Sequence, residues 1–219
     1  MMQILAISQE EKAAEKAPGK ISGQVILMSA TNSNLTGHFF NDMPAVRGTV
    51  TASKGGFGFL AGRNSDLINP KSPGNVCILM PSYSNTFGKY TTTFTAELYL
   101  FDHHVNMDVF APGMTFTRRG AVNVELFVAY GWSFQHERNP DMFTQRVALS
   151  KEIAGFNFRL IGWNLWYGTH RNAAAFEISK NLTEQIRLFI SGNRNHNYGN
   201  ENQSPKTHKF GTVRFAYSF

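Results

Sequence analysis

Apolar and polar residues alternate with a period of two along most of the chain beyond residue 20. The clearest case is Ala121–Phe134. One face of this segment carries Val122, Val124, Leu126, Val128, Tyr130 and Trp132, and the other carries Asn123, Glu125, Phe127, Ala129, Gly131 and Ser133. A period of two is typical of a β-strand whose two faces meet different surroundings.

Twelve such segments follow one another, separated by turn-rich or polar connections. None contains a run of about 18 apolar residues, so the sequence predicts no transmembrane helix. The pattern predicts an all-β chain of about twelve strands, with ten or fourteen as the alternative counts. The predicted strands are Lys20–Thr31, Pro44–Ser53, Gly56–Arg63, Asn75–Ser82, Tyr90–Phe101, Asp108–Arg118, Ala121–Phe134, Met142–Ser150, Gly155–Gly168, Ala173–Ser179, Glu184–Ser191 and His208–Phe219.

The last strand ends the chain on an aromatic face. Phe219, Tyr217, Phe215 and Val213 share one side, while Arg214 lies on the other. This ending resembles the C-terminal assembly signal of bacterial outer-membrane β-barrels, with a terminal Phe, an aromatic residue two positions earlier and apolar residues at every second position before it. The resemblance implies a Gram-negative outer membrane, surrounding lipid, both termini in the periplasm, and contact with the barrel-assembly machinery through the final strand.

The lengths of the connections between the predicted strands alternate as they do in an outer-membrane barrel. Connections two, six, eight and ten are tight, whereas one, three, five, seven and eleven are long or polar; the fourth is intermediate, and only the short ninth, Thr169–Asn172, breaks the order. Outer-membrane barrels have long loops at one end, short turns at the other and an even number of strands. The sequence therefore predicts a transmembrane antiparallel up-and-down β-barrel over residues 20–219.

Composition agrees with a membrane barrel. Aromatic residues make up 13% of the 219 residues, and charged residues make up 16%, against roughly 25% in soluble domains. The mean hydropathy is only -0.26, as expected when an apolar exterior surrounds a polar interior. The net charge of +6 comes from scattered Lys and Arg rather than a cluster, so nucleic acid is not an expected partner.

Two further features bound the chain. Cys77 is the only cysteine, which excludes an internal disulfide framework and a cysteine-based metal site. Residues 1–19 lack the basic start and the full apolar stretch of a signal peptide. They are interpreted either as a flexible tail or as the remnant of a signal peptide.

The strand faces assign candidate site residues. Eight charged residues fall on the faces opposite the apolar ones and are predicted to line the lumen as a possible solute path: Arg47, Glu97, Glu125, Arg146, Arg159, Glu177, Arg187 and Arg214. They could pair across neighbouring strands, as Glu125–Arg146 and Glu177–Arg187, and fill the barrel, or they could form a channel whose excess of Arg favours anions. Aromatic residues near the strand ends are predicted to lie at the membrane interfaces: Trp132, Trp163, Trp166, Tyr217 and Phe219.

Catalytic chemistry is not expected. Some outer-membrane barrels are lipid hydrolases that resemble one another in a His-x-Ser on a strand, and this chain has no His-x-Ser. The seven histidines fall in or beside predicted outer loops, and Asp102-His103-His104 is a weak signal. The sequence predicts neither enzyme activity, nor a metal site, nor a cofactor.

The function that fits these patterns is a passive porin-like channel for small polar or anionic solutes. In size and strand number the chain looks like small monomeric sugar-acid channels of the outer membrane. The alternative is a closed structural or interaction subunit that presents loops Asn32–Met43 and Gly192–Thr207 to a protein partner. A soluble lipocalin-like carrier is a third possibility.

Overall fold

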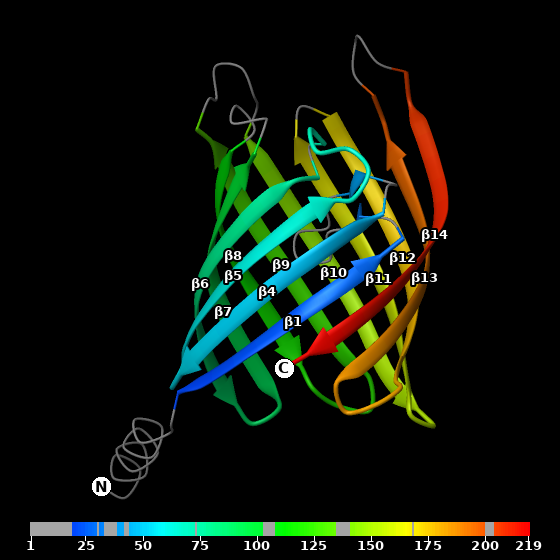
Figure 1. Cartoon of the computed structure of the whole chain (residues 1–219). Helices are drawn as coiled ribbons and strands as arrows, with labels where there is room; N and C mark the ends of the chain where they lie inside the picture. Colours follow the sequence, from blue (N-terminus) through cyan, green and yellow to red (C-terminus); the bar gives the residue numbers. More distant parts are fainter. Residues whose placement is uncertain are drawn as a thin grey trace, which may run out of the picture.

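A computed structural model shows a closed β-barrel with strands running alternately up and down (Figure 1). It describes residues 19–29, 31–32, 39–41, 44–72, 74–102, 108–134, 141–167, 169–199 and 204–219. Twelve strands of this part form the barrel, in the order β1-β14-β13-β12-β11-β10-β9-β8-β7-β6-β5-β4. Their bounds are β1 Lys20–Met28, β4 Ala45–Lys54, β5 Phe57–Asp66, β6 Val76–Phe87, β7 Tyr90–Phe101, β8 Val109–Arg118, β9 Asn123–Ser133, β10 Met142–Ile153, β11 Phe156–Tyr167, β12 Thr169–Asn181, β13 Ile186–Asn197 and β14 Lys206–Ser218.

The prediction of a twelve-stranded antiparallel barrel is therefore confirmed. Two short strands, β2 Thr31–Asn32 and β3 Phe39–Asn41, pair separately from the barrel. They include the end of the predicted strand Lys20–Thr31 and part of the predicted loop Asn32–Met43. The rest of that loop lies outside the described residues, as does nearly all of the predicted tail 1–19. No helix among the described residues is long and apolar enough to cross a bilayer.

Several strands are longer than the alternation predicts. The predicted loop Gly192–Thr207 is partly strand, because β13 continues to Asn197 and β14 begins at Lys206. The predicted loop Thr169–Asn172 is the start of β12. Both segments are polar on both faces, so they carry no alternation, but their backbones still pair with neighbouring strands, for example Asn195 with His208.

Tight turns join the strands at the end of the barrel where β1 begins and β14 ends (Figure 1). The turn between β10 and β11 consists of Ala154 and Gly155, with φ angles of 52° and 77°. Positive φ at both central residues is what the right-handed twist of a two-residue hairpin requires. We refer to this as the turn end of the barrel and to the opposite end as the loop end.

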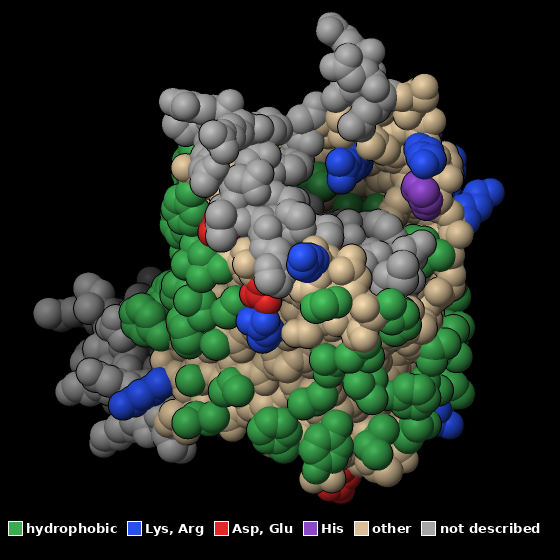
Figure 2. Space-filling view, turned by 45° about the horizontal axis from the view of Figure 1, so that its top comes forward, with side chains coloured by type: hydrophobic (Ala, Val, Ile, Leu, Met, Phe, Trp, Pro, Cys, Tyr) green, Lys and Arg blue, Asp and Glu red, His purple; other side chains and the backbone are tan. Residues whose placement is uncertain are grey.

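The two faces of the wall differ sharply. Side chains that point outward are largely apolar and exposed, such as Leu126, Val147, Leu160, Ile190 and Phe215. Figure 2 shows hydrophobic side chains spread over the visible wall and several basic side chains at the loop end. A water-soluble carrier would leave this band in contact with water, whereas a bilayer would cover it, so the lipocalin-like hypothesis is rejected.

The barrel closes between β1 and β14. Gln24–Met28 pair with Ser218–Arg214, and Gly23 and Phe219 exchange backbone hydrogen bonds of 2.9 and 3.0 Å. The Phe219 ring covers Gly23 so closely that a Cβ at residue 23 would lie 2.3 Å from the ring. The last residue therefore forms part of the seam.

Candidate functional site: the charged lumen

All eight charged residues predicted for the lumen lie on the inner face of the wall. Arg47, Glu97, Arg146, Glu177 and Arg214 are buried although each lies on a strand whose alternate side chains are exposed apolar ones. Glu125, Arg159 and Arg187 are partly buried on the same side. The period of two is sufficient to place these residues inward, because the sheet has a single interior.

Glu125 is the centre of one charge cluster. Its Oε1 accepts hydrogen bonds from Arg146 Nη2 at 2.6 Å and from Arg159 Nη2 at 3.3 Å. The pair with Arg146 on the adjacent strand matches the prediction. The contact with Arg159 spans from β9 to β11 past the intervening strand, which the curved inner surface of a barrel permits.

The predicted pair Glu177–Arg187 is wrong. Glu177 on β12 pairs with Arg214 on β14, and both side chains are buried. Arg187 Nη2 instead donates to Ser179 Oγ at 2.9 Å. Adjacent strands are not the only neighbours inside a narrow barrel, so register alone does not choose between two arginines.

Two inward aromatic rings hold these arginines, and the sequence-based prediction did not identify them. The guanidinium carbons of Arg187 and Arg214 lie 5.1 and 4.8 Å from the Phe189 ring centroid. Arg146 lies 5.0 Å from the Phe127 ring. Cations over aromatic faces are attracted by the ring quadrupole. The signal that could have found them is parity, since Phe127 and Phe189 fall on the charged faces of β9 and β13.

Trp163 also faces the lumen, so its predicted place at the membrane interface is wrong. Its side chain is 5% exposed and packs with Ile161, Ala148 and Ala175. The prediction used the position of Trp163 near the end of the strand and ignored its parity with Arg159, which also points inward. Its indole nitrogen has no hydrogen-bond partner among the described residues.

The Trp163 cluster lies between two cavities along β11 and β12. Toward the turn end, a cavity of about 360 Å³ is lined by Glu125, Arg159, Glu177, Arg187 and Phe189, among others. Toward the loop end, a cavity of about 230 Å³ is lined in part by Arg171, Lys206, His208, Asn195 and Trp163. The lumen thus combines basic and amide groups at its mouth with paired charges at its base.

The other predicted interface aromatics are exposed on the outer face. Trp132 and Trp166 lie toward the loop end, and Tyr217 and Phe219 toward the turn end. Trp132 contacts the Tyr130 ring at a centroid distance of 5.1 Å. Trp166 stacks on His170 at 4.6 Å, and His170 stacks on Tyr198 at 4.7 Å.

The described residues contain no group of three or more His, Cys, Asp or Glu that could hold a metal ion. Asp102 pairs with Arg63, while His103 and His104 lie outside the described residues. His170 belongs to the outer aromatic row and His208 lines the mouth cavity.

Comparisons with known proteins give the fold but no family. No family model matches the chain, and no curated protein matches it by sequence. Among solved structures, the chain is similar to the KdgM porin, with a TM-score of 0.62 at 8% identity over 92% of this chain and 98% of that one. A structure described as the KdgM porin in complex with disordered oligogalacturonate gives 0.63 at 9% identity over 92% and 99%. The NanC porin gives 0.58 at 12% identity over 91% and 99%. The fold is thus that of porin-like outer-membrane barrels.

Proposed function

We propose that this chain is an outer-membrane barrel through which small polar solutes, chiefly anions, diffuse passively. The observation that supports this most directly is the inner wall. Five arginines and three glutamates face a lumen with cavities at both ends, and Arg171 and Lys206 add positive charge at the mouth. Charge on a pore wall selects among solutes by electrostatics.

Acidic sugars are the first solutes to test. The mouth combines cationic side chains with amides and the Trp163 ring, a set that can bind carboxylates and sugar hydroxyls together. A similar barrel, the KdgM porin, has been solved with oligogalacturonate. Acidic sugars are therefore proposed for this chain on two grounds, the chemistry of its mouth and its similarity in fold to that porin.

Planar-bilayer recording of the purified, refolded barrel tests the channel. We expect discrete conductance steps and a reversal potential in a KCl gradient that indicates preference for chloride. The double variant Arg159→Gln/Arg187→Gln should move the reversal potential toward zero. The control Arg118→Gln/Lys151→Gln removes two exposed outward cations and should leave it unchanged.

A specific observation favours one competing function. The buried Trp163 cluster lies between the two cavities, as in a closed barrel that serves as a structural or interaction subunit. Absence of discrete conductance from the wild-type barrel, with its strand content intact by circular dichroism, would reject the channel and favour this subunit.

We also propose an orientation in which the turn end lies in the periplasm. In that orientation the barrel-assembly machinery binds β14 from the periplasmic side. In a Cys77→Ser background, a cysteine at Asn69 in the β5–β6 loop should react with a membrane-impermeant maleimide in intact cells. A cysteine at Glu184 in the β12–β13 turn should react only after lysis. Labelling of Glu184→Cys in intact cells would reverse the orientation.

A further inference from the structure

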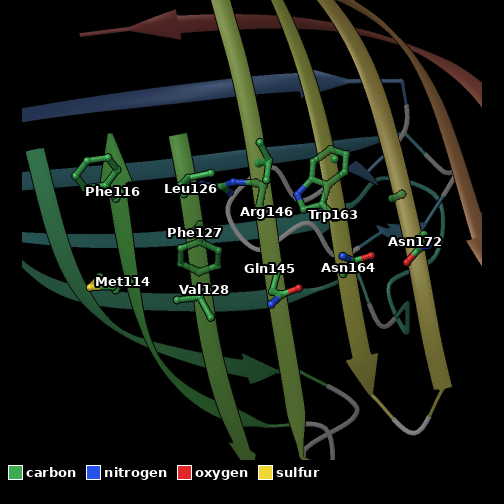
Figure 3. A pocket seen from close by; sticks show the side chains of 13 residues that line it. Met114, Phe116, Leu126, Phe127, Val128, Gln145, Arg146, Trp163, Asn164 and Asn172 are labelled. Atoms are coloured by element: carbon green, nitrogen blue, oxygen red, sulfur yellow. The ribbon is translucent and has the colours of Figure 1, made fainter. Parts of the chain in front are cut away.

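The outer wall over β10–β12 carries a row of side-chain amides where an apolar surface is expected. Gln145 pairs in register with Asn164, and Asn164 pairs with Asn172. Gln145 and Asn164 alternate with outward neighbours, such as Val147 and Trp166, that are exposed apolar residues. Figure 3 shows the three amides side by side on adjacent strands.

The amide row lies deeper than the aromatic row of the same wall. Phe143 and Trp166, which pair in register with ring centroids 5.5 Å apart, are one outward position nearer the loop end than Gln145 and Asn164. Aromatic belts mark the level of the lipid headgroups. The amides therefore face the headgroup boundary or the acyl region beneath it, where an unpaired polar group is costly.

These amides are incompletely paired within the described part of the chain. Asn172 Nδ2 donates to Tyr198 Oη at 2.9 Å, but Asn172 Oδ1 is buried and accepts no hydrogen bond from any described residue. Gln145 is exposed and Asn164 is half-buried. The row thus offers donors and acceptors to whatever lies against the wall.

A groove adjoins the amide row. It has a volume of about 670 Å³ and is lined by the outward side chains of Leu126, Val128 and Val147, with Gly162 at its floor and the three amides along one side. A Cβ added at Gly162 would meet no atom within 4 Å, so the space over this residue is open. An apolar groove of this size has room for part of an acyl chain.

Two cations lie on the outward row that contains Gly162, next to the amide row. Gly162 pairs with Ala174, Ala174 with Arg194, and Arg194 with Lys209. Arg194 and Lys209 are exposed and point outward by parity with Ile190 and Val213. Because the strands are tilted (Figure 1), this row rises toward the loop end from β11 to β14, which brings the two cations above the groove. Two adjacent cations on a lipid-facing wall complement an anionic headgroup, because charge-assisted hydrogen bonds to phosphate are strong.

We propose that this face binds a phosphate-bearing lipid of the surrounding leaflet. Arg194 and Lys209 hold the phosphate, the amides of Gln145, Asn164 and Asn172 bond the polar linkage between headgroup and chain, and an acyl chain lies in the groove over Gly162. The site is outside the lumen, so it does not depend on whether the barrel conducts.

Native mass spectrometry of the folded barrel in a neutral detergent tests the site, with palmitoyl-oleoyl phosphatidylglycerol as the probe. We expect one lipid to be retained in preference to dioleoylglycerol, which lacks phosphate. Arg194→Ala/Lys209→Ala should weaken retention by roughly tenfold or more, as expected for loss of charged hydrogen bonds. Gln145→Leu/Asn164→Leu should also weaken it while leaving the strand content unchanged.

Matched controls use outward polar residues at the turn end. Arg118→Ala/Lys151→Ala and Asn85→Leu remove exposed outward groups of the same chemistry and should retain the lipid as the wild type does. Equal retention by Arg194→Ala/Lys209→Ala and wild type would overturn the site. Displacement of the lipid by millimolar inorganic phosphate would also overturn it and would indicate a free-anion site. A dimer that is present in the wild type and lost in Gln145→Leu/Asn164→Leu would overturn it too and would indicate that a second copy binds this face.

Discussion

Phe189 is an inward side chain that contacts two cations, since both Arg187 and Arg214 lie over its ring. Contacts of this kind are worth about 0.5–2 kcal/mol each, so the ring holds two guanidinium groups near the wall. Replacing the ring by a smaller apolar side chain should release Arg187 first, because Arg214 is also held by Glu177.

We expect Phe189→Leu to raise the anion preference of the channel, measured as a larger chloride reversal potential in planar bilayers. Phe156→Leu is the control. Phe156 lies on the outer face at the turn end, and the Nζ atom of Lys180 is 4.6 Å from its ring centroid. Both variants lose one aromatic ring against a cation, but only the first should change selectivity. An equal change in both would mean that ring loss acts through general loosening of the barrel.

The Glu177–Arg214 pair illustrates how burial changes the contribution of an ion pair to the free energy of unfolding. Both side chains are under 10% exposed, and breaking a buried pair typically costs about 3–5 kcal/mol because the remaining charge is stranded. Glu177→Gln should therefore lower the free energy of unfolding by about that amount, measured by urea titration in detergent micelles. Asp102→Asn removes a carboxylate from the exposed Arg63 pair and should cost less than about 1 kcal/mol. Similar losses for the two variants would show that water reaches the Glu177 pair.

At the scale of the elements, the seam between β1 and β14 is a short junction, with five paired positions against nine in the ladder between β1 and β4. Gly23 and Phe219 lengthen this junction by one further pair of backbone hydrogen bonds, and the Phe219 ring lies over Gly23. Any side chain at residue 23 displaces that ring, and overpacking of this kind costs about 1–3 kcal/mol.

Gly23→Val should destabilise the folded barrel, seen as a lower midpoint in urea unfolding. Gly48→Val is the control, because a Cβ at Gly48 meets nothing within 4 Å and β-branched residues suit an exposed apolar strand face. Combining Gly23→Val with Phe219→Ala should cost less than the sum of the single changes. Additive losses would show that Gly23 and Phe219 act independently.

The elements also show what the sequence could and could not predict. The alternation was enough to locate the twelve strands and the inward position of every charged lumen residue, since parity depends only on a strand having two faces. It ended β13 too early, because Asn193–Asn197 are polar on both sides beyond the apolar band. The partner of Glu177 could not be predicted, because choosing Arg214 over Arg187 requires the curvature of the closed barrel.

For the molecule as a whole, Trp163 lies between the charged base of the lumen and its basic mouth. The residue lies in a buried cluster between cavities of about 360 and 230 Å³. Trp166, three positions along the same strand, is on the outer face and 38% exposed. The two residues have the same side chain on opposite sides of one wall, so together they separate the effect of the lumen from that of the membrane face.

Trp163→Ala should join the two cavities and increase single-channel conductance by at least about twofold, because the indole is by far the largest side chain of its cluster and large rings carry most of the packed volume. Trp166→Ala should lower thermal stability in detergent and leave conductance unchanged, since it removes only the outer ring contacts with Phe143 and His170. Unchanged conductance in Trp163→Ala, with the wild type conducting, would place the narrowest point of the path elsewhere. A conductance that appears only in Trp163→Ala would identify the native barrel as closed by this residue.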